Sequence, residues 1–354
     1  MGYKRSMSLP PTADVVIVGA GFAGAATAWA LARRGVADVV VLEREVQLGR
    51  FASGRSAGLG RQVAEDDHTT ALTVRGAALL RELAQVAQVA PVWLPSGGLL
   101  SFDDVAHANA YAERAQRFGV PVVLGGPDEI TARWPQLAEL RCARTLWVPS
   151  DGTIDVAALL AAFTAGVRVE LGCPVARIDA APASAPVVVT PRGSIAARVV
   201  VDASGAWAGE LTGAPAVTAF KRHVFVMSAD AAPGAPWLWH LGAGEMYLRA
   251  DAGGVLASPC DSAQCAPGHQ DPDLVGEAHL RRLLDEADSA LAGAPITRRW
   301  ACQRSFTDDR KMRLERDAAR PWLVWAAGLG GHGATASAAV GERVAADVMA
   351  ALAT

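Results

Sequence analysis

The stretch DVVIVGAGFAGAATAWALARRGVADVVVLERE, residues 14–45, decides the fold. An apolar, β-branched run ends in glycines, a helix-forming run follows, and a second apolar run ends in an acid. Gly19, Gly21 and Gly24 have the spacing G-x-G-x-x-G, and Glu43 follows about twenty residues later. Such glycines permit a sharp turn, the approach of a pyrophosphate to the backbone, and close packing of helix on strand. The stretch therefore predicts a βαβ dinucleotide site, with phosphates at the helix N-terminus and ribose hydroxyls on Glu43; an ordinary glycine turn is the alternative.

The loop LGRFASGRSAGLGRQ, residues 48–62, follows the second predicted strand and has poor propensity for helix or strand. Its arginines are Arg50, Arg55 and Arg61, and its hydroxyls are those of Ser53 and Ser56. Backbone amides and arginines in this arrangement suit a pyrophosphate or the polar edge of a flavin. A solvated surface loop is the alternative interpretation.

The composition indicates two domains and no nucleic-acid surface. The chain has 354 residues, of which 51% are hydrophobic, so it can form large cores; its formal net charge of −3 offers no basic surface. The five cysteines are scattered, odd in number and without a C-x-x-C pair, so we expect reduced thiols, a cytoplasmic protein and no metal site. They are Cys142, Cys173, Cys260, Cys265 and Cys302.

Neither a membrane span nor a secretion signal is expected. No uninterrupted apolar stretch is long enough to cross a bilayer. Lys4 and Arg5 are followed by no apolar run before Pro10 and Pro11, which argues against a signal peptide.

In the middle of the chain, predicted helices alternate with predicted strands. Residues 69–90 predict a long amphipathic helix. From Pro91 onward we expect strand, glycine turn and strand, then a helix over 103–119, a short strand, and a helix that breaks before Pro135. Asp155 then caps a predicted helix from Val156 to Phe163, where the chain returns to the first domain.

The following residues predict mainly strands. ARVVVDASGAW, residues 197–207, is a buried strand that ends at Ser204 and Gly205. Two aromatic-rich strands follow, with a hairpin turn at residues 251–254, and residues 271–292 predict a charge-laced amphipathic helix. In the strand over 296–306, Trp300, Cys302, Arg304 and Phe306 share a face.

A second glycine cluster lies near the end of the chain. An apolar strand runs into Gly328, Gly330, Gly331 and Gly333, and a helix of small residues follows. The N-terminus of such a helix can face an anionic group, and for a flavin this is the N1/C2=O edge, which becomes negative on reduction. A plain glycine turn before a helix is the alternative.

Taken together, these motifs resemble one family: the amine-oxidising flavoproteins that include D-amino acid oxidase, glycine oxidase, monomeric sarcosine oxidase and D-amino acid dehydrogenases. The motifs are VVIVGAGFAGAATAWALARRG, VVVLERE, ASGRSAG, PSDGTID, VVVDASGAWAGEL and GLGGHGATASAAVGE. ASGRSAG, the pairing of KRH with MYLRADAG, and the arginine of WACQRSF look most like the D-arginine dehydrogenase branch.

The resemblance implies an α/β fold with two domains. The first is a Rossmann-like FAD-binding domain of the GR2 type, over residues 1–90, 141–215 and 296–354. The second is an α+β substrate domain on a mainly antiparallel sheet, over residues 91–140 and 216–295. FAD is expected to bind without a covalent link, because no cysteine lies in the glycine-rich C-terminal motif.

The resemblance also assigns site residues. Val175 would contact the adenine through its backbone, and Ser53, Arg55 and Ser56 would lie along the cofactor. The residues expected to bind FAD are Gly19, Gly21, Gly24, Glu43, Arg44, Ser53, Arg55, Ser56, Val175, Gly205, Gly330, Gly331, His332, Gly333, Ala334 and Thr335.

Three further residues match positions that hold the substrate carboxylate over the flavin: Arg222, Tyr247 and Arg304. An arginine offers a planar fork to a carboxylate, and a tyrosine hydroxyl adds a third donor. A surface or salt-bridge role is the alternative for each arginine. His332 either hydrogen-bonds flavin or substrate or fills its turn.

These assignments predict oxidation of an α-amino acid, a D-amino acid in the first interpretation. Hydride passes from the α-carbon to flavin N5, and the imino acid hydrolyses to a 2-oxo acid and ammonia. A second interpretation is oxidation of a secondary amine, such as an N-methyl amino acid, or of a 2-hydroxy acid, including as a tailoring step in biosynthesis. A third is a non-catalytic electron carrier. An NADP-dependent reductase, with Arg44 on the 2′-phosphate, is a weaker rival because it leaves the second glycine cluster unexplained.

The sequence departs from the D-arginine branch at PSGGLLSF, residues 95–102. A cationic side chain requires an acid, and glycine stands where that acid is expected. A smaller or apolar substrate is therefore favoured over a basic one. The expected partner is a small carboxylate-bearing amine, with neither nucleic acid nor a membrane segment involved.

Overall fold

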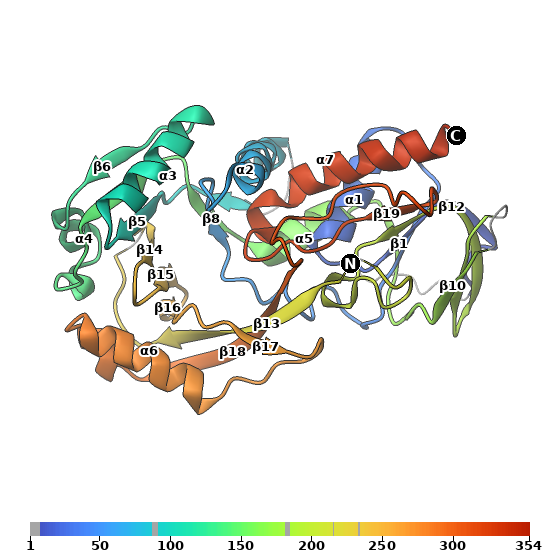
Figure 1. The fold of residues 1–354 in the computed structure, drawn as a ribbon. Helices are drawn as coiled ribbons and strands as arrows, with labels where there is room; N and C mark the ends of the chain where they lie inside the picture. The colour runs from blue at the N-terminus through green and yellow to red at the C-terminus, as the bar shows by residue number, and fades with distance from the viewer. Residues whose placement is uncertain (1–7, 87–90, 181–184, 215, 233) are drawn as a thin grey trace.

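The computed structural model describes residues 8–86, 91–180, 185–214, 216–232 and 234–354. Lys4 and Arg5, and the last four residues of the helix predicted over 69–90, lie outside these ranges. The described chain forms two large sheets that lie side by side, with helices packed against each (Figure 1).

The first sheet is built around the N-terminal βαβ unit. Its strand order is β10 (Arg177–Asp179), β11 (Val187–Thr190), β12 (Gly193–Asp202), β1 (Thr12–Val18), β2 (Val39–Leu42) and β9 (Arg168–Glu170), with β19 (Leu323–Trp325) also paired to β12. β1 runs parallel to both β12 and β2, and β19 is parallel to β12. Only the β10–β11–β12 meander is antiparallel. The parallel strands are buried on both faces, which explains their continuous runs of valine and isoleucine.

The helices of this domain are α1 (Phe22–Arg33), α2 (Asp67–Val86), α5 (Val156–Thr164) and α7 (Gly333–Leu352). α7 lies against both α1 and α2, and α5 lies against α1. Glycines let α7 pack closely on two helices of this domain: a Cβ at Gly341 would lie 2.3 Å from the carbonyl oxygen of Ala26, and one at Gly76 would lie 2.1 Å from that of Thr335. The side chain of Asp155 accepts hydrogen bonds from the backbone N–H groups of Ala157 and Ala158, so the predicted helix cap is confirmed.

The second sheet is mainly antiparallel. Its strand order is β17 (Ala263–Cys265), β13 (Thr218–Met227), β16 (Gly254–Ser258), β15 (Met246–Asp251), β14 (Trp237–Leu241), β5 (Gly98–Phe102), β7 (Arg144–Val148) and β6 (Val123–Gly125), with β18 (Ile296–Phe306) also paired to β13. β14 and β5 pair in parallel, whereas the other strand pairs of this sheet among the described residues are antiparallel. A separate small sheet holds β3 (Leu59–Gly60), β8 (Gly152–Ile154) and β4 (Trp93–Leu94).

The two faces of the second sheet have different roles. α6 (Leu274–Glu286), α4 (Asp128–Arg133) and the 3-10 helix η1 (Pro135–Leu137) pack on the face that carries Phe225 and Met227. Val224 and Val226 point to the opposite face, as strand alternation requires, and share it with Trp239, Tyr247 and α3 (Val105–Arg117). This second face carries the site described below.

The predicted fold class is confirmed, but two strands cross the predicted domain boundaries. β7 and β18 pair within the second sheet, although residues 141–215 and 296–354 were assigned to the nucleotide domain. Both strands stand where the chain passes from one domain to the other, and their partners are distant in sequence. β18 runs from the second sheet toward the nucleotide domain (Figure 1). Arg304 stands two residues before the end of this strand.

Candidate functional site

The first turn of the βαβ unit requires glycine at two positions. Gly19 has φ +97°, and a Cβ there would lie 2.6 Å from the carbonyl oxygen of Ala203. A Cβ at Gly24 would lie 1.9 Å from the carbonyl oxygen of Gly19, so any side chain would push α1 away from β1. The turn therefore leaves the N-terminus of α1 next to the backbone of β1 and β12.

The predicted acid, Glu43, stands beside this turn. Its Oε2 accepts a hydrogen bond from the backbone N–H of Ala20 at 2.9 Å, and its Oε1 accepts one from the N–H of Glu45 at 2.9 Å. The carboxylate is thus fixed at the end of β2, on the wall of a cavity that Gly19, Gly21 and Val175 also line.

Two adjoining cavities extend from this turn. The nucleotide cavity is lined by the turn itself, Glu43 and Val175, and the amine cavity lies between the C-terminal glycines and the second sheet. Both cavities are lined by Gly21, Ala52, Ser53, Ala203, Gly205, Gln303 and Ser305. Ser53 accepts a hydrogen bond from the N–H of Phe22 at 2.9 Å, which fixes the loop against the start of α1. The cavities suit one elongated molecule.

The C-terminal glycines form the far wall of the amine cavity. Gly330 has φ +56°, and a Cβ there would lie 2.5 Å from the ring of Phe306. The expected residues Gly330, Gly331, His332, Gly333, Ala334 and Thr335 all line this cavity, as does Ser56. The Thr335 hydroxyl donates to the carbonyl of Leu59 at 3.1 Å and so ties the start of α7 to β3.

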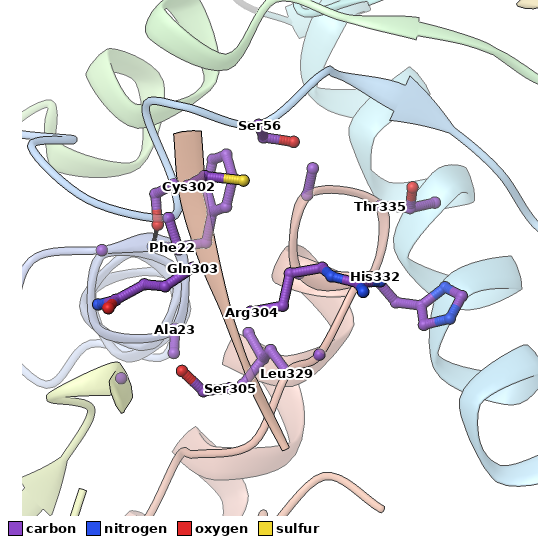
Figure 2. Close-up of a pocket in the computed structure, with 18 of the residues that line it drawn as sticks. Phe22, Ala23, Ser56, Cys302, Gln303, Arg304, Ser305, Leu329, His332 and Thr335 are labelled. Atoms are coloured by element: carbon purple, nitrogen blue, oxygen red, sulfur yellow. Dashed lines mark hydrogen bonds between the residues drawn. The ribbon is translucent and has the colours of Figure 1, made fainter. Parts of the chain in front are cut away.

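The same cavity is also lined by Arg304, Arg222 and Tyr247. Arg304 extends from β18 toward the glycine turn, where a Cβ at Gly331 would lie 3.5 Å from its Nη1 (Figure 2). Arg222 is 3% exposed; its Nε and Nη2 donate to the carbonyls of Asp261 and Cys260, each at 2.8 Å, which fixes the plane of its guanidinium. Within the described residues, neither arginine pairs with a carboxylate.

Arg222, which is buried, and Arg304, which is half-buried, are therefore neighbouring cations without a carboxylate partner among the described residues. Burial, followed by the positive charge of Arg222, lowers the pKa of Arg304 to about 10. The Nε of Arg304 is also buried without a hydrogen-bond partner. Burial raises the pKa of the Tyr247 hydroxyl above its usual value, so Tyr247 remains a neutral donor. This part of the cavity wall is suited to a carboxylate, which would relieve both the charge repulsion and the missing hydrogen bonds.

His332 makes a specific contact that the glycine motif did not predict. Its Nε2 lies 2.8 Å from Oε2 of Glu65 and 3.3 Å from Nη2 of Arg61. Arg61 is 2% exposed and lies over the ring of Trp239, with its Cζ 4.2 Å from the ring centroid. His332 is thus held by a charged cluster at the cavity wall.

Arg55 is the one predicted loop residue that the structure places elsewhere. It lines neither cavity; its Nη1 donates to the carbonyls of Ala301 and Gln270 at 2.7 and 3.1 Å. Backbone carbonyls of the second domain thus take up its guanidinium, and the expectation that Arg55 lies along the cofactor stays a prediction. Gly24 also lies outside both cavities, and its role is packing.

Arg44 is placed on the nucleotide cavity by aromatic rings. Its guanidinium lies 3.6 Å from the ring centroid of Trp207 and 5.0 Å from that of Phe51, and its Nε pairs with Glu45 at 3.3 Å. Phe51 packs edge-on against Trp207. Arg44 is therefore engaged within the protein.

Sequence reasoning missed Arg61, Trp239 and Gln303, all of which line the cavities. Arg61 was one of three arginines in an irregular loop, and no local pattern set it apart from the other two. Trp239 and Gln303 lie within strands, and nothing in their local pattern marks them as different from core residues.

A buried acid is hydrogen-bonded to the end of the loop over residues 48–62. Asp151 is fully buried; its Oδ1 accepts hydrogen bonds from the backbone N–H and the side chain of Gln62, and its Oδ2 has no partner. Burial raises its pKa to about 7, although the hydrogen bonds from Gln62 favour the ionised form. An unfolded aspartate ionises near pH ~4. Between about pH 4 and 7 the folded chain therefore holds a proton that the unfolded chain has lost, and the free energy of unfolding decreases as pH rises.

Replacing Asp151 with asparagine should remove this decrease, since the amide cannot ionise. The difference between the unfolding temperature of Asp151→Asn and that of the unchanged protein should therefore depend on pH. From pH 5 to pH 8 it should shift in favour of the variant by roughly 3–5 °C. Thermal unfolding measured across this pH range checks it, with the exposed Glu139→Gln as control. Parallel profiles for the two proteins would show that Asp151 does not titrate in this window.

The residues present fit FAD. A Cβ at Gly21 would lie 3.0 Å from the hydroxyl of Ser53, so the backbone is bare where a pyrophosphate would pass. Glu43 can accept from a ribose, and the start of α7 offers its positive end to the second cavity. The described residues contain no group of three or more potential metal ligands, and no helix among them is long and apolar enough to cross a membrane.

Comparison with known families agrees with this site. Residues 14–347 match the DAO family, described as FAD dependent oxidoreductase. The protein belongs to this family of FAD dependent oxidoreductases, and FAD is the cofactor that the family implies.

Individual relatives are more distant. Mitochondrial sarcosine dehydrogenase of Mus musculus is 30% identical over 243 residues, which cover 63% of this chain and 26% of that protein. Mitochondrial dimethylglycine dehydrogenase of Rattus norvegicus is 24% identical over 332 residues, which cover 84% of this chain and 38% of that protein. The chain thus spans well under half the length of these curated relatives.

Solved structures establish the fold. L-Proline dehydrogenase from P. horikoshii has a TM-score of 0.86 and 24% identity, covering 95% of this chain and 93% of that one. Glycine oxidase from Geobacillus kaustophilus has a TM-score of 0.82 and 24% identity, covering 96% of this chain and 95% of that one. The narrower resemblance to D-arginine dehydrogenases stays a prediction.

Proposed function

We propose that this protein oxidises the C–N bond of a small amine that carries a carboxylate. The observation that carries the proposal is Arg304: a half-buried cation on the cavity wall that has a buried, unpartnered Nε, lacks an anionic partner among the described residues and stands next to Arg222. An electron carrier has no need for such a pair, since each buried cation costs free energy unless an anion joins it.

The chain's residues would bind and orient the substrate. Arg304 and Tyr247 would hold the carboxylate, which leaves the amine and the α-carbon directed toward the glycine turn. Positive charge on Arg222 and Arg304 disfavours a second cation nearby, so a bound substrate amine would lose its proton more readily and become neutral. When bound, FAD supplies the acceptor for the hydride that the neutral amine releases from its α-carbon.

The same wall argues against a basic substrate. Three arginines line the amine cavity. A Cβ at Gly97 would lie 2.0 Å from the ring of Trp147, and one at Gly98 would lie 2.1 Å from that of Trp237, so tryptophans fill the place where an acid was looked for. The D-amino acid expected from the sequence would therefore have a neutral or acidic side chain.

A secondary amine is the second candidate. The relatives named above act, by their names, on sarcosine and dimethylglycine, which are N-methylated amino acids. Both of these compounds carry a carboxylate, so Arg304 would serve a primary or a secondary amine.

We also propose that FAD is held without a covalent bond. Cys302 lines the amine cavity, but burial raises the pKa of its thiol and so disfavours the reactive thiolate.

Anaerobic mixing of the FAD-loaded protein with matched compounds tests the proposal. The panel pairs D- and L-alanine with ethylamine, sarcosine with dimethylamine, and D- and L-aspartate, which carry a second carboxylate, with β-alanine. Lactate is added as a 2-hydroxy acid. We expect at least one carboxylate-bearing amine to bleach the flavin and its decarboxylated partner to fail. Ammonia as product identifies a primary amine, and methylamine from sarcosine identifies a secondary one. If no amine bleaches the flavin, or ethylamine and dimethylamine work equally well, the proposal is wrong.

A further inference from the structure

Arg61 is a third cation on the amine cavity, and it lies apart from the carboxylate clamp. It follows β3 in the loop between β3 and α2, whereas Arg222 and Arg304 lie on β13 and β18. The Trp239 ring contacts both regions: Arg61 Cζ is 4.2 Å from its centroid, and the Tyr247 ring is 5.2 Å away. The clamp and Arg61 are thus neighbouring but distinct places on one wall.

The guanidinium of Arg61 is incompletely used. Its Nη2 lies 2.5 Å from Glu65 Oε1 and 3.3 Å from His332 Nε2. Its Nε and Nη1 are buried and have no hydrogen-bond partner. Buried N–H groups of a charged side chain are rarely left without an acceptor, because each loses its contact with water. The Nε–Nη1 edge of Arg61 therefore needs a hydrogen-bond acceptor, and none of the described residues supplies one.

The carboxylates nearby are already engaged on other atoms. Glu65 contacts only Nη2 of Arg61 and also holds His332, and its side chain is 54% exposed. Glu245 accepts a hydrogen bond from the indole N–H of Trp239 at 2.9 Å. Three arginines thus line the amine cavity and neither of these acids does, which leaves an excess of positive charge on its wall.

We infer that the substrate carries a second anionic group, which binds the Nε–Nη1 edge of Arg61 while its amino-acid carboxylate lies on Arg304 and Tyr247. The substrate class is a small dicarboxylic amine, that is, an acidic amino acid or a glycine with a carboxylate on its N-substituent. The inference rests on the proposed function and narrows its substrate.

Unreactive thioethers test the binding without turnover. (Methylthio)acetate carries one carboxylate, thiodiacetate carries two, and the monoamide of thiodiacetate matches the diacid in size but has one charge. Their dissociation constants follow from titration of the flavin absorption of the FAD-loaded protein. We expect thiodiacetate to bind about tenfold or more tightly than both monoanions, as one charge-assisted contact implies.

Variants then test whether Arg61 causes the tighter binding of the dianion. Arg61→Met should bring the ratio of monoanion to dianion dissociation constants to within about twofold, and Arg61→Lys should restore part of it. Glu65→Gln, which removes the competing acid, should increase the ratio. Arg81→Met is the matched control, since Arg81 also lies over a tryptophan, Trp93, but lines neither cavity.

The outcomes separate this inference from the proposed function. If (methylthio)acetate binds but thiodiacetate binds no more tightly, or if Arg61→Met weakens FAD binding and leaves the ratio unchanged, the second anionic subsite does not exist while the proposed function stands. If no thioether binds and no amine bleaches the flavin, both are overturned.

Discussion

Replacing Arg304 with methionine should lower kcat/KM for the best amine substrate by about a thousandfold, while the protein still purifies with FAD. The variant loses two charge-assisted hydrogen bonds to the substrate carboxylate, each worth roughly 1.5–3 kcal/mol, and a thousandfold corresponds to about 4 kcal/mol. Stability should not fall, because the buried Nε of the half-buried Arg304 has no partner and removal of this side chain breaks no ion pair among the described residues. Steady-state kinetics and thermal unfolding of the same preparation measure both effects.

Arg310 provides the matched control for this experiment. Its guanidinium lies 5.0 Å from the centroid of Phe306, and that of Arg304 lies 5.4 Å from the same ring, but Arg310 is exposed and lines neither cavity. Arg310→Met should change kcat/KM by less than about twofold. Equal losses in both variants, or a full rate in Arg304→Met, would remove Arg304 from the carboxylate clamp.

Replacing Gly24 with alanine should abolish flavin binding. The new Cβ would lie 1.9 Å from the backbone oxygen of Gly19, and no side-chain rotation can relieve a clash with backbone. α1 must therefore move away from β1, which carries its N-terminus away from the phosphates and costs on the order of 1–3 kcal/mol or more in stability. We expect less than about a tenth of the usual flavin content, measured as the ratio of flavin to protein absorption.

Gly126→Ala is the control for this substitution, because a Cβ at Gly126 meets nothing within 4 Å. It should retain full flavin content and thermal stability. A Gly24→Ala protein that is as yellow and as stable as the control would mean that the close packing of α1 on the first turn is not needed for the site.

The parts of the fold that follow from local sequence were predicted well. Gly19 and Gly24 are required by contacts within one short turn, and Asp155 caps the helix that directly follows it. The assignment of β7 and β18 to the second sheet was missed, because strand pairing between distant segments leaves no mark on the local pattern.

The same contrast between local sequence and long-range contacts explains which residues of the candidate site could be predicted. Arg222, Tyr247 and Arg304 were proposed from motif resemblance, and the structure brings all three to one cavity. Arg55 and Arg61 stand in one irregular loop without periodicity, so the sequence gives no direction to either side chain. Carbonyls of the second domain hold Arg55, whereas Trp239 and Glu65 hold Arg61, and only the folded chain distinguishes them.

In the proposed site, two glycine-lined corners that are far apart in the chain hold one FAD and present its ring to a carboxylate-bearing molecule. A crystal structure of the protein with FAD and (methylthio)acetate tests this most directly. We predict FAD extended through both cavities, from Glu43 to the turn at Gly330 and Gly331, with the carboxylate within hydrogen-bond distance of Arg304 and Tyr247. FAD bound away from either glycine corner, or a carboxylate that contacts neither Arg304 nor Tyr247, would contradict it.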